Sequence, residues 1–396
     1  MLSLDKVFNA QTVLKSIIRE TNVVRANGIA PDCELYLKPE NLQITGSFKV
    51  RGSAYKIAML SDEEKAKGVI ACSAGNHAQG VALAATKNGI KSLICLPDSA
   101  PISKVEATKG YGAEVCLVEG CYDDAYQKAL ELRDSQGYTF VHPFDDENVI
   151  AGQGTIALEI LNELDNIDAI VVPIGGGGLI SGIAYTVKQI RPSVKVYGVQ
   201  AAGAPGMFNS VKDNKIEELK GVSTIADGIA VKQPGENTFR YVSDYVDEIA
   251  LVSDDEVSSA ILALIEKQKM IAEGAGAVAV AAVMAGKFDL KGKRVVAVVS
   301  GGNIDVTSLS RVIDRGLLNS GRSSSLLIEL IDKPGQLKVI SRIIADCGGN
   351  VTGVHYEKGN TESVNGCFLR IQMETRDFEH VNLITRSLRA EGFKLV

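Results

Sequence analysis

Apolar runs and stretches of helical periodicity alternate along most of the chain. The apolar runs, rich in β-branched side chains, lie at residues 69–72, 92–96, 113–118, 169–173, 195–199 and 294–299. Stretches with helical spacing of apolar residues lie at 76–88, 103–109, 122–133, 179–190 and 305–318. Strands that are apolar on both faces and separated by helices are typical of parallel sheets with helices on both faces. The pattern therefore predicts an α/β fold, in which ligands bind beyond the carboxyl ends of the strands.

The pattern changes near the C-terminus, where residues 319–325 (NSGRSSS) are small or polar and lack apolar periodicity, which is typical of a linker. A βαββαβ order of elements follows, at 326–331, 336–347, 351–357, 367–373, 378–389 and 393–396. A polar hairpin separates its two middle strands. This order indicates a ferredoxin-like domain. We expect a first domain at 1–320 with a smaller subdomain at roughly 48–150, a linker at 321–325 and a second domain at 326–396.

The length and charge exclude several classes of protein. With 396 residues, the chain exceeds the usual size of a single core, which agrees with two or three domains. The net charge of −6 argues against a nucleic-acid or anionic-membrane partner. No apolar run reaches the ~18 residues of a membrane span. The N-terminus has no basic segment followed by an apolar one, so that we expect a cytoplasmic protein.

Metal chemistry is not expected either. The seven cysteines are scattered and form no pair of CxxC motifs, so that we interpret them as reduced thiols. The four histidines include no HExxH motif.

Lys49 lies in residues 45–52 (TGSFKVRG), a glycine-flanked loop that leads into a helical stretch at 53–60. A lysine between Phe48 and Val50 at the entry to a helix can be partly desolvated, which lowers the pKa of its amine and makes it nucleophilic. The alternative is an ordinary surface lysine, which this segment alone favours. Other loops at the ends of strands change that balance.

Three further loops follow predicted strands. Residues 73–80 (SAGNHAQG) open a helix, whose exposed N–H groups bind anions such as a substrate carboxylate, although Ser73 or Asn76 could serve only as a helix N-cap. Residues 175–178 are four consecutive glycines, and a backbone without β-carbons can curl its amides around a phosphate. Their spacing is not GxGxxG and no P-loop lysine follows, which makes a nucleotide the weaker interpretation. Residues 300–303 (SGGN) end the strand at 294–299.

Together these four segments resemble the fold-type II pyridoxal phosphate (PLP) enzymes, which have the tryptophan synthase β-like fold, and among them the threonine ammonia-lyases. TGSFKVRG is similar to the family's Schiff-base segment, SAGNHAQG to its substrate and cofactor loop, GGGGL to its phosphate-binding loop and SGGN to its contact with the pyridine nitrogen. The resemblance covers roughly residues 5–320. It implies a carbon–nitrogen lyase that converts L-threonine to 2-oxobutanoate and ammonia, and L-serine to pyruvate.

The resemblance also implies roles for individual residues. Lys49 would form a Schiff base with the cofactor and then take the proton from the substrate Cα. Asn76 would contact the 3′-oxygen of the cofactor, and Ser300 would hydrogen-bond its pyridine nitrogen. The implied cofactor contacts are Lys49, Phe48, Asn76, Gly175, Gly176, Gly177, Gly178, Leu179 and Ser300. The implied substrate contacts are Ser73, Ala74, Gly75, Asn76 and His77.

Four positions bear on how closely the chain follows this pattern. Related serine racemases have a second serine at the position of Ala74, and without that hydroxyl we expect racemisation to be minor. Some relatives bind a divalent cation through an acidic residue where this chain has Gln200, so that no metal is expected. Glu273 matches a position near the cofactor ring, or it is a helix-start glutamate favoured by the helix dipole. His77 contacts the substrate carboxylate, or it caps a helix.

The C-terminal unit resembles an ACT domain, one of a family of small-molecule sensors that regulate amino-acid metabolism. Residues 332–335 (DKPG) match its strand-to-helix turn, and 348–351 (GGNV) match the corner where ligands bind. The resemblance implies an allosteric amino-acid or nucleotide effector and subunit pairing in a homo-oligomer, either a dimer or a tetramer. Isoleucine is the first candidate because 2-oxobutanoate precedes it in isoleucine biosynthesis, and valine is an alternative. The implied effector residues are Asp332, Gly335, Gly349 and Asn350.

Other functions are kept as alternatives. The same motifs are compatible with a serine racemase or serine dehydratase. A sulphur-transferring synthase of this fold usually has threonine at the position of His77. A non-catalytic amino-acid sensor belongs to a different class, and the presence of Lys49, Asn76, the four glycines and Ser300 argues against it.

Overall fold

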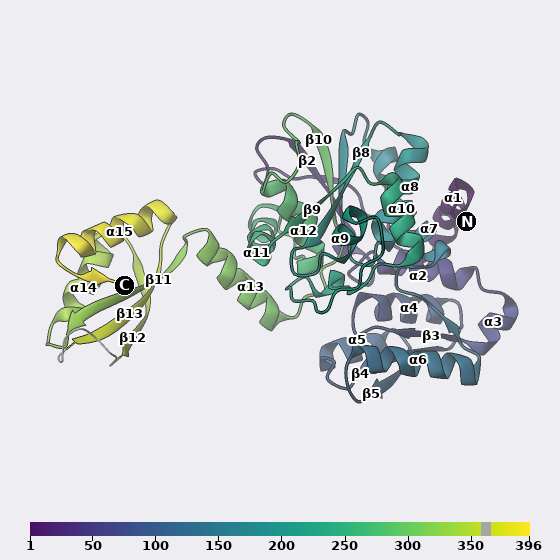
Figure 1. Ribbon diagram of the computed structural model, residues 1–396, viewed down its shortest axis with the longest axis horizontal. Helices are drawn as coiled ribbons and strands as arrows, with labels where there is room; N and C mark the ends of the chain where they lie inside the picture. Colours follow the sequence, from purple (N-terminus) through teal and green to yellow (C-terminus); the bar gives the residue numbers. More distant parts are fainter. Residues whose placement is uncertain (358–365) are drawn as a thin grey trace. The chain divides into compact units, whose positions relative to one another are not determined.

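The computed structural model describes residues 1–357 and 366–396, so that the polar hairpin expected between two C-terminal strands lies outside the described residues. The chain forms two compact units, Met1–Asp305 and Val306–Val396 (Figure 1). The boundary between the units therefore lies before the helix expected at 305–318, whereas we expected it after this helix, near residue 320. The helix belongs to the second unit because it contacts that unit's first strand. None of the described helices is both long enough and apolar enough to span a membrane.

The first unit contains a six-stranded sheet in which every pairing is parallel except that of β1 with β2. In the order β1-β2-β10-β7-β8-β9, the strands are Val24–Arg25, Glu34–Pro39, Arg294–Val299, Ala169–Pro173, Lys195–Ala201 and Glu248–Val252. The strands expected at 169–173 and 294–299 have their predicted bounds. The parallel sheet and its helices confirm the predicted α/β class.

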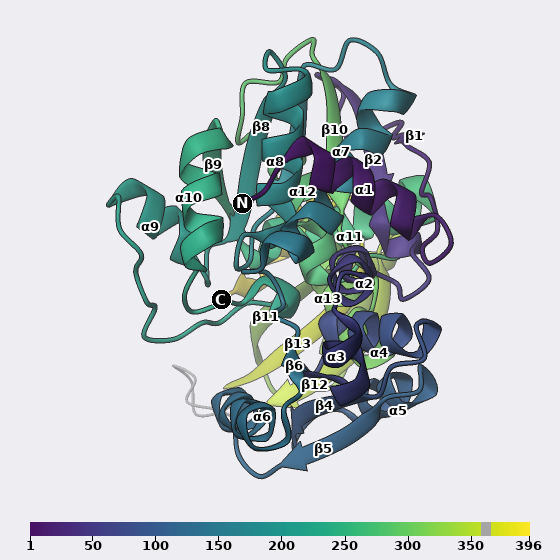
Figure 2. The same ribbon diagram turned by 90° about the vertical axis from the view of Figure 1, so that its right-hand side faces the viewer.

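Helices cover both faces of this sheet (Figures 1 and 2). α7 (Glu147–Glu163) and α8 (Gly178–Ile190) pack on one face, where Ile183 shares an apolar cluster with Val172 and Val296. α12 (Gly274–Met284) packs on the other face and is almost entirely buried, which its glycine, alanine and valine side chains allow. Other helices of this unit are α1 (Leu4–Leu14), α2 (Lys49–Ala58), α3 (Asp62–Lys67), α9 (Gly206–Lys212), α10 (Glu236–Tyr245), α11 (Asp254–Ala263) and short turns at Glu40–Leu42, Asp227–Ile229 and Leu264–Gln268.

A second, smaller sheet of four parallel strands lies in the same unit. In the order β5-β4-β3-β6, its strands are Glu114–Val118, Ser92–Pro97, Val69–Cys72 and Thr139–Phe140. α4 (Asn76–Lys87) covers one face through residues such as Val81, and α6 (Tyr122–Gln136) covers the other through Ala125 and Ala129. α5 (Ile102–Gly110) follows β4. The two-residue strand β6 was not predicted.

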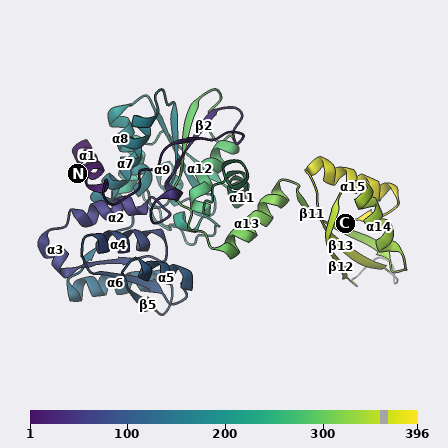
Figure 3. The same ribbon diagram turned by 180° about the vertical axis from the view of Figure 1, so that it is seen from behind.

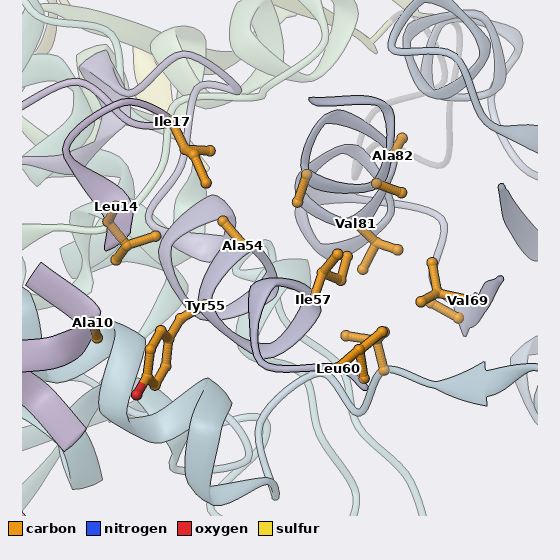
Figure 4. Packing of buried hydrophobic residues seen from close by; sticks show 14 of the residues in the cluster. Ala10, Leu14, Ile17, Ala54, Tyr55, Ile57, Leu60, Val69, Val81 and Ala82 are labelled. Carbon is orange, nitrogen blue, oxygen red and sulfur yellow. The ribbon is translucent and has the colours of Figure 1, made fainter. Parts of the chain in front are cut away.

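Helix α2 is packed between α1 and α4, as Figure 4 shows. Tyr55 points toward α1, where its hydroxyl donates a hydrogen bond to Asn9 Oδ1 at 3.0 Å. Ile57 lies on the side of Val81 of α4. The helix begins at Lys49, so that the candidate lysine stands in the first turn of a packed helix and not in a loop before it.

The second unit begins with α13 (Val306–Asn319) and continues as an antiparallel four-stranded sheet (Figure 3). In the order β12-β13-β11-β14, the strands are Asn350–Glu357, Gly366–Glu374, Ser323–Ile331 and Lys394–Leu395. α14 (Gln336–Asp346) and α15 (Phe378–Ala390) supply Ile340 and Ile384 to the core between helices and sheet. The chain order β11-α14-β12-β13-α15-β14 is that of a ferredoxin-like unit.

The serine-rich segment differs from the expectation of a linker at 321–325. Ser323, Ser324 and Ser325 pair with residues of β13 and are therefore strand residues. Their small polar side chains show no alternation of apolar and polar positions, which is why the pattern missed them. The chain turns just before them, at Gly321, whose φ of +68° lies in the left-handed region that favours glycine.

Candidate active site

The candidate residues lie beyond the carboxyl ends of strands from both sheets. Lys49 begins α2 after β2 and a short helical turn, and residues 73–76 follow β3. The glycines at 175–178 follow β7, and Ser300 follows β10. This is the edge at which α/β sheets bind ligands.

Backbone contacts join the segment of Lys49 to the segment of Ser300. The Phe48 N–H donates to the Ser300 carbonyl at 3.1 Å, and Ser47 pairs with Gly301 in an isolated antiparallel bridge. The Ser300 hydroxyl, which is 3% exposed, donates to the Ala275 carbonyl at 3.2 Å. The structure therefore places two of the predicted segments side by side, although they are far apart in the sequence.

Asn76 is held by two polar side chains. Its Nδ2 donates to Glu273 Oε1 at 2.6 Å, and its Oδ1 accepts from Asn303 Nδ2 at 2.7 Å. Asn303 also donates to the Thr45 carbonyl at 2.7 Å, which ties Asn76 to the loop before Lys49. Asn303 was quoted in the SGGN segment but was not predicted as a site residue. Its amide side chain at the carboxyl end of a strand was the available signal.

The side chain of Lys49 is partly buried. Its Nζ donates to the Pro143 carbonyl at 2.9 Å and lies 5.3 Å from the centre of the Phe48 ring. Desolvation lowers the pKa of this amine to about 8, and the carboxylate of Glu273 opposes the shift. These surroundings do not fit an ordinary surface lysine, and they make the neutral, nucleophilic amine accessible near neutral pH.

Glu273 stands before α12 and is 5% exposed. Burial, followed by the charge of Asp227, raises the pKa of its carboxyl to about 7, while Asn76, Lys104 and Lys49 lower it. Its side chain makes no N-cap hydrogen bond. The bond to Asn76 thus favours the site position over the helix-start alternative.

The four glycines form a tightly packed turn at the start of α8. A β-carbon on Gly176 would lie 2.5 Å from the ring of Phe144, and one on Gly178 would lie 2.9 Å from its Cα. Gly177 has a φ of +100°, which other residues rarely adopt. Within the described chain, the buried N–H groups of residues 176–178 have no hydrogen-bond acceptor from the protein. Unpaired donors at a helix start suit an anion, so that these residues fit a phosphate group.

The segment 141–146 contacts most of the site and was not predicted. It supplies the Pro143 carbonyl to Lys49 and the Phe144 ring to the glycine turn. Its own shape is fixed by His142 Nδ1, which accepts from the N–H groups of Phe144 and Asp145 at 3.3 and 2.7 Å. The segment follows β6, so that the rule on strand ends would have found it if this two-residue strand had been recognised.

His77 lies inside the fold. It is 3% exposed, its Nε2 donates to the Val141 carbonyl at 2.8 Å, and its Nδ1 lies 3.4 Å from Ser53 Oγ. Burial lowers the pKa of the imidazole to about 3, so that the ring is neutral. Because both ring nitrogens have protein partners, the imidazole is used within the fold, and a contact between His77 and a substrate stays a prediction. His77 does not cap α4, since it is the second residue of that helix.

The other residues of the SAGN loop are partly exposed and available to a ligand. Ser73 Oγ accepts from the Gly75 N–H at 3.1 Å, and Ala74 is partly buried. Gln200 uses its amide within the fold, because Oε1 accepts from the Phe208 N–H at 2.7 Å. Among the described residues there is no cluster of His, Cys, Asp or Glu that could hold a metal ion.

A buried ion network lies beneath the first turn of α2. Arg51 is fully buried and donates to Glu40 through Nε at 2.7 Å and to Glu159 through Nη2 at 2.8 Å. Lys38 also contacts Glu159, at 2.6 Å. The carboxylates outweigh the desolvation of the guanidinium and raise the pKa of Arg51, and Arg51 in turn holds the pKa of Glu40 below its usual value. The network anchors the helix that begins at Lys49.

Comparisons with known proteins agree with this geometry. The chain is 47% identical to the L-threonine ammonia-lyase of Thermotoga maritima, with 100% of this chain and 99% of the relative covered. A solved threonine deaminase isoform 2 from Solanum lycopersicum superposes with a TM-score of 0.76 at 37% identity, covering 80% of this chain and 90% of that one. A maize serine racemase superposes with a TM-score of 0.75 at 34% identity, covering 80% and 98% of the two chains.

The sequence profile of the family described as "Pyridoxal-phosphate dependent enzyme" matches residues 14–301. That range contains the candidate lysine, the SAGN loop, the glycine turn and Ser300. By its sequence and by the site just described, this chain belongs to the family of pyridoxal-phosphate dependent enzymes.

Proposed function

We propose that this chain is a threonine ammonia-lyase that converts L-threonine to 2-oxobutanoate and ammonia, and L-serine to pyruvate. The observation that carries the proposal is the 47% identity to an L-threonine ammonia-lyase over the whole of both chains. The alignment includes the second unit, so that the relative shares both units of this chain. We also propose that the protein is cytoplasmic and that it assembles as a dimer or tetramer.

The chain's own residues divide the work of the reaction. Bound PLP supplies the electron sink that stabilises negative charge at the substrate Cα. The unpaired N–H groups of the glycine turn would hold the cofactor's phosphate, and Asn76, fixed by Glu273 and Asn303, would contact the cofactor. Lys49 would hold the cofactor, and its amine, whose pKa is lowered to about 8, would take the proton from the substrate Cα. Loss of the β-hydroxyl as water and hydrolysis by another water then yield the 2-oxo acid and ammonia.

Steady-state assays of the PLP-loaded protein test this proposal. L-threonine should yield equal amounts of 2-oxobutanoate and ammonia, and L-serine should yield pyruvate. A protein that is fully loaded with PLP and releases neither 2-oxo acid would contradict the proposal. Absorption at 400–430 nm distinguishes that case from a protein that holds no PLP.

Ala74 is expected to make the enzyme a lyase and not a racemase. The methyl group of Ala74 cannot transfer a proton to the opposite face of the substrate Cα, so that protonation should come from one side only. Chiral chromatography during turnover of L-serine should show pyruvate in large excess over D-serine. Ala74→Ser is the matched variant, in which the D-serine fraction should rise. Comparable amounts of D-serine and pyruvate from the unmodified protein would refute the role of Ala74.

The second unit is part of the proposal as an ACT-like sensor that pairs with the same unit of another subunit. Gly335, with a φ of +94°, forms the turn into α14, and Asn350 Nδ2 donates to Glu374 Oε2 at 2.9 Å across the start of β12. Together with Asp332 and Gly349, these residues lie at the two turns that flank α14. The two turns lie at opposite ends of α14, so that a site formed by both requires the paired unit of another subunit. We infer that such a paired site binds an amino acid, with isoleucine first and valine second, or a nucleotide.

A chain that ends at Gly321 should keep PLP and turnover but lose the response to the effector. The reason is that every residue of the candidate active site precedes Asp305, the end of the first unit. The measurement is the rate of 2-oxobutanoate release with and without isoleucine, valine and nucleotides, in both chains. A tenfold change in affinity requires only ~1.4 kcal/mol of coupling. If the shortened chain responds as the full chain does, the effector site lies in the first unit.

A further inference from the structure

A threonine outside the predicted motifs is bonded directly to the glycine turn. Thr238 belongs to α10 and is fully buried. Its hydroxyl donates to the Gly176 carbonyl at 2.6 Å. The same side chain packs against the next residue, because a β-carbon on Gly177 would lie 2.7 Å from Thr238 Cβ. No pattern in the sequence around Thr238 marks it as part of the site.

The direction of this hydrogen bond is fixed by its surroundings. Thr238 Oγ1 accepts from the Gly235 N–H at 3.1 Å, which leaves the hydroxyl proton to point toward a carbonyl. The Gly176 carbonyl at 2.6 Å is closer than the other carbonyl in reach, that of Gly235 at 3.1 Å. The Thr238 N–H donates to Asp145 Oδ1 at 3.1 Å, so that the start of α10 is held against the segment that also packs on the glycine turn.

The bond determines how one peptide group of the turn is oriented. In a planar trans peptide, the carbonyl of one residue and the N–H of the next point in opposite directions. With the Gly176 carbonyl held by Thr238, the Gly177 N–H must point away from α10. This N–H is one of the buried donors that lack an acceptor from the described protein. Glycine has no side-chain preference to keep this peptide from rotating, so that an external hydrogen bond is needed.

We propose that Thr238 is a positioning residue for cofactor binding, whose hydroxyl orients the peptide between Gly176 and Gly177 so that its N–H group faces the phosphate. The inference rests on the phosphate-binding role of the glycine turn given under the proposed function, and not on the choice of threonine as the substrate. Thr238 itself does not touch the phosphate; it acts through the backbone of Gly176.

The test compares PLP with pyridoxal, which lacks the phosphate. In fluorescence titrations of the full-length apo-protein, Thr238→Val should weaken PLP binding at least tenfold, which corresponds to about 1.4 kcal/mol. Its affinity for pyridoxal should equal that of the unmodified protein. Thr238→Ser keeps the hydroxyl and should restore PLP binding. If Thr238→Val does not fold, Thr238→Ala removes the same hydroxyl with less bulk and allows the same comparison.

Thr186→Val is the matched control. Thr186 is also fully buried, and its hydroxyl donates to the Gly182 carbonyl at 2.8 Å within α8, away from the glycine turn. This variant should lose a similar amount of stability but bind PLP normally. The proposal is overturned if both valine variants weaken PLP binding equally, if pyridoxal binding falls by the same factor as PLP binding, or if serine does not restore it. Because the readout is binding, these outcomes do not depend on whether the enzyme deaminates threonine.

Discussion

Replacing Lys49 by alanine is expected to lower the turnover of L-threonine by at least ~10³-fold while the protein stays folded, since a positioned acid–base group alone contributes roughly 10²–10⁴-fold. The variant loses that group and also the amine that links to the cofactor. Among the described residues Lys49 donates one hydrogen bond, to the Pro143 carbonyl, so that circular dichroism should show little change. The measurement is kcat for 2-oxobutanoate release. Lys67→Ala is the control, because Lys67 is exposed and pairs with Glu63 at 2.8 Å on the surface.

The same amine can be identified chemically. Borohydride reduction of the PLP-loaded enzyme and peptide mapping should place the pyridoxyl group on Lys49, and a label on a different lysine would contradict the assignment. The rate at which apo-protein captures PLP should rise with pH and level off above about 8, since only the neutral amine attacks an aldehyde. Desolvation sets this pKa, Glu273 opposes it, and the nearby His77 and His142 both have lowered pKa values and are uncharged at that pH.

Replacing Arg51 by methionine is expected to lower the free energy of unfolding of the first unit by about 3–5 kcal/mol, the usual cost of removing one partner of a buried ion pair. Methionine replaces only the unbranched stem of arginine, so that the change removes the charged guanidinium together with its hydrogen bonds. Glu40 would lose both of its hydrogen bonds to the guanidinium. Glu159 would lose Arg51 and, within the described network, keep its ion pair with Lys38. Urea unfolding followed by circular dichroism measures the change.

Arg133→Met is the matched control for this prediction. Arg133 pairs with Asp134 at 2.7 Å on the surface, where an ion pair contributes about 0–1 kcal/mol. Adding Glu40→Gln to Arg51→Met should recover part of the lost stability, because it removes the unpaired buried charge. If Arg51→Met and Arg133→Met shift the urea midpoint equally, the network does not stabilise α2.

Local patterns in the sequence were sufficient to predict the strands and helices between residues 69 and 133 and the glycine turn after β7. In these segments the chemistry is local: β-branched runs predict strands, and consecutive glycines predict a turn that other residues cannot form. The start of α2 was placed four residues too late, at 53 instead of Lys49. Its first turn contains Arg51, which is polar, and Gly52, which disfavours a helix. The turn is helical because of buried partners elsewhere in the chain.

The contacts that complete the site could not be read from local patterns. Thr238 and Pro143 act through a hydroxyl and a backbone carbonyl, which any sequence contains in large numbers. Glu40 and Glu159 look like surface glutamates until the fold brings both to Arg51. His77 was assigned to the substrate because its loop is similar to a known motif, although the fold uses both of its nitrogens. Tertiary proximity, and not residue type, decides these roles.

The pairing of β2 with β10 has a consequence for synthesis on the ribosome. β2 ends at Pro39, but its parallel neighbour β10 begins only at Arg294, so that at 5–20 residues per second the strand waits on the order of 10–50 s for its partner. The small sheet uses strands from residues 69–140 alone and can form during that time. The segment of Lys49 meets Ser300, through the Phe48 N–H, only when β10 has joined the large sheet. A nascent or truncated chain that stops before this point therefore presents the lysine without its site, and we expect cofactor capture to coincide with the completion of the first unit.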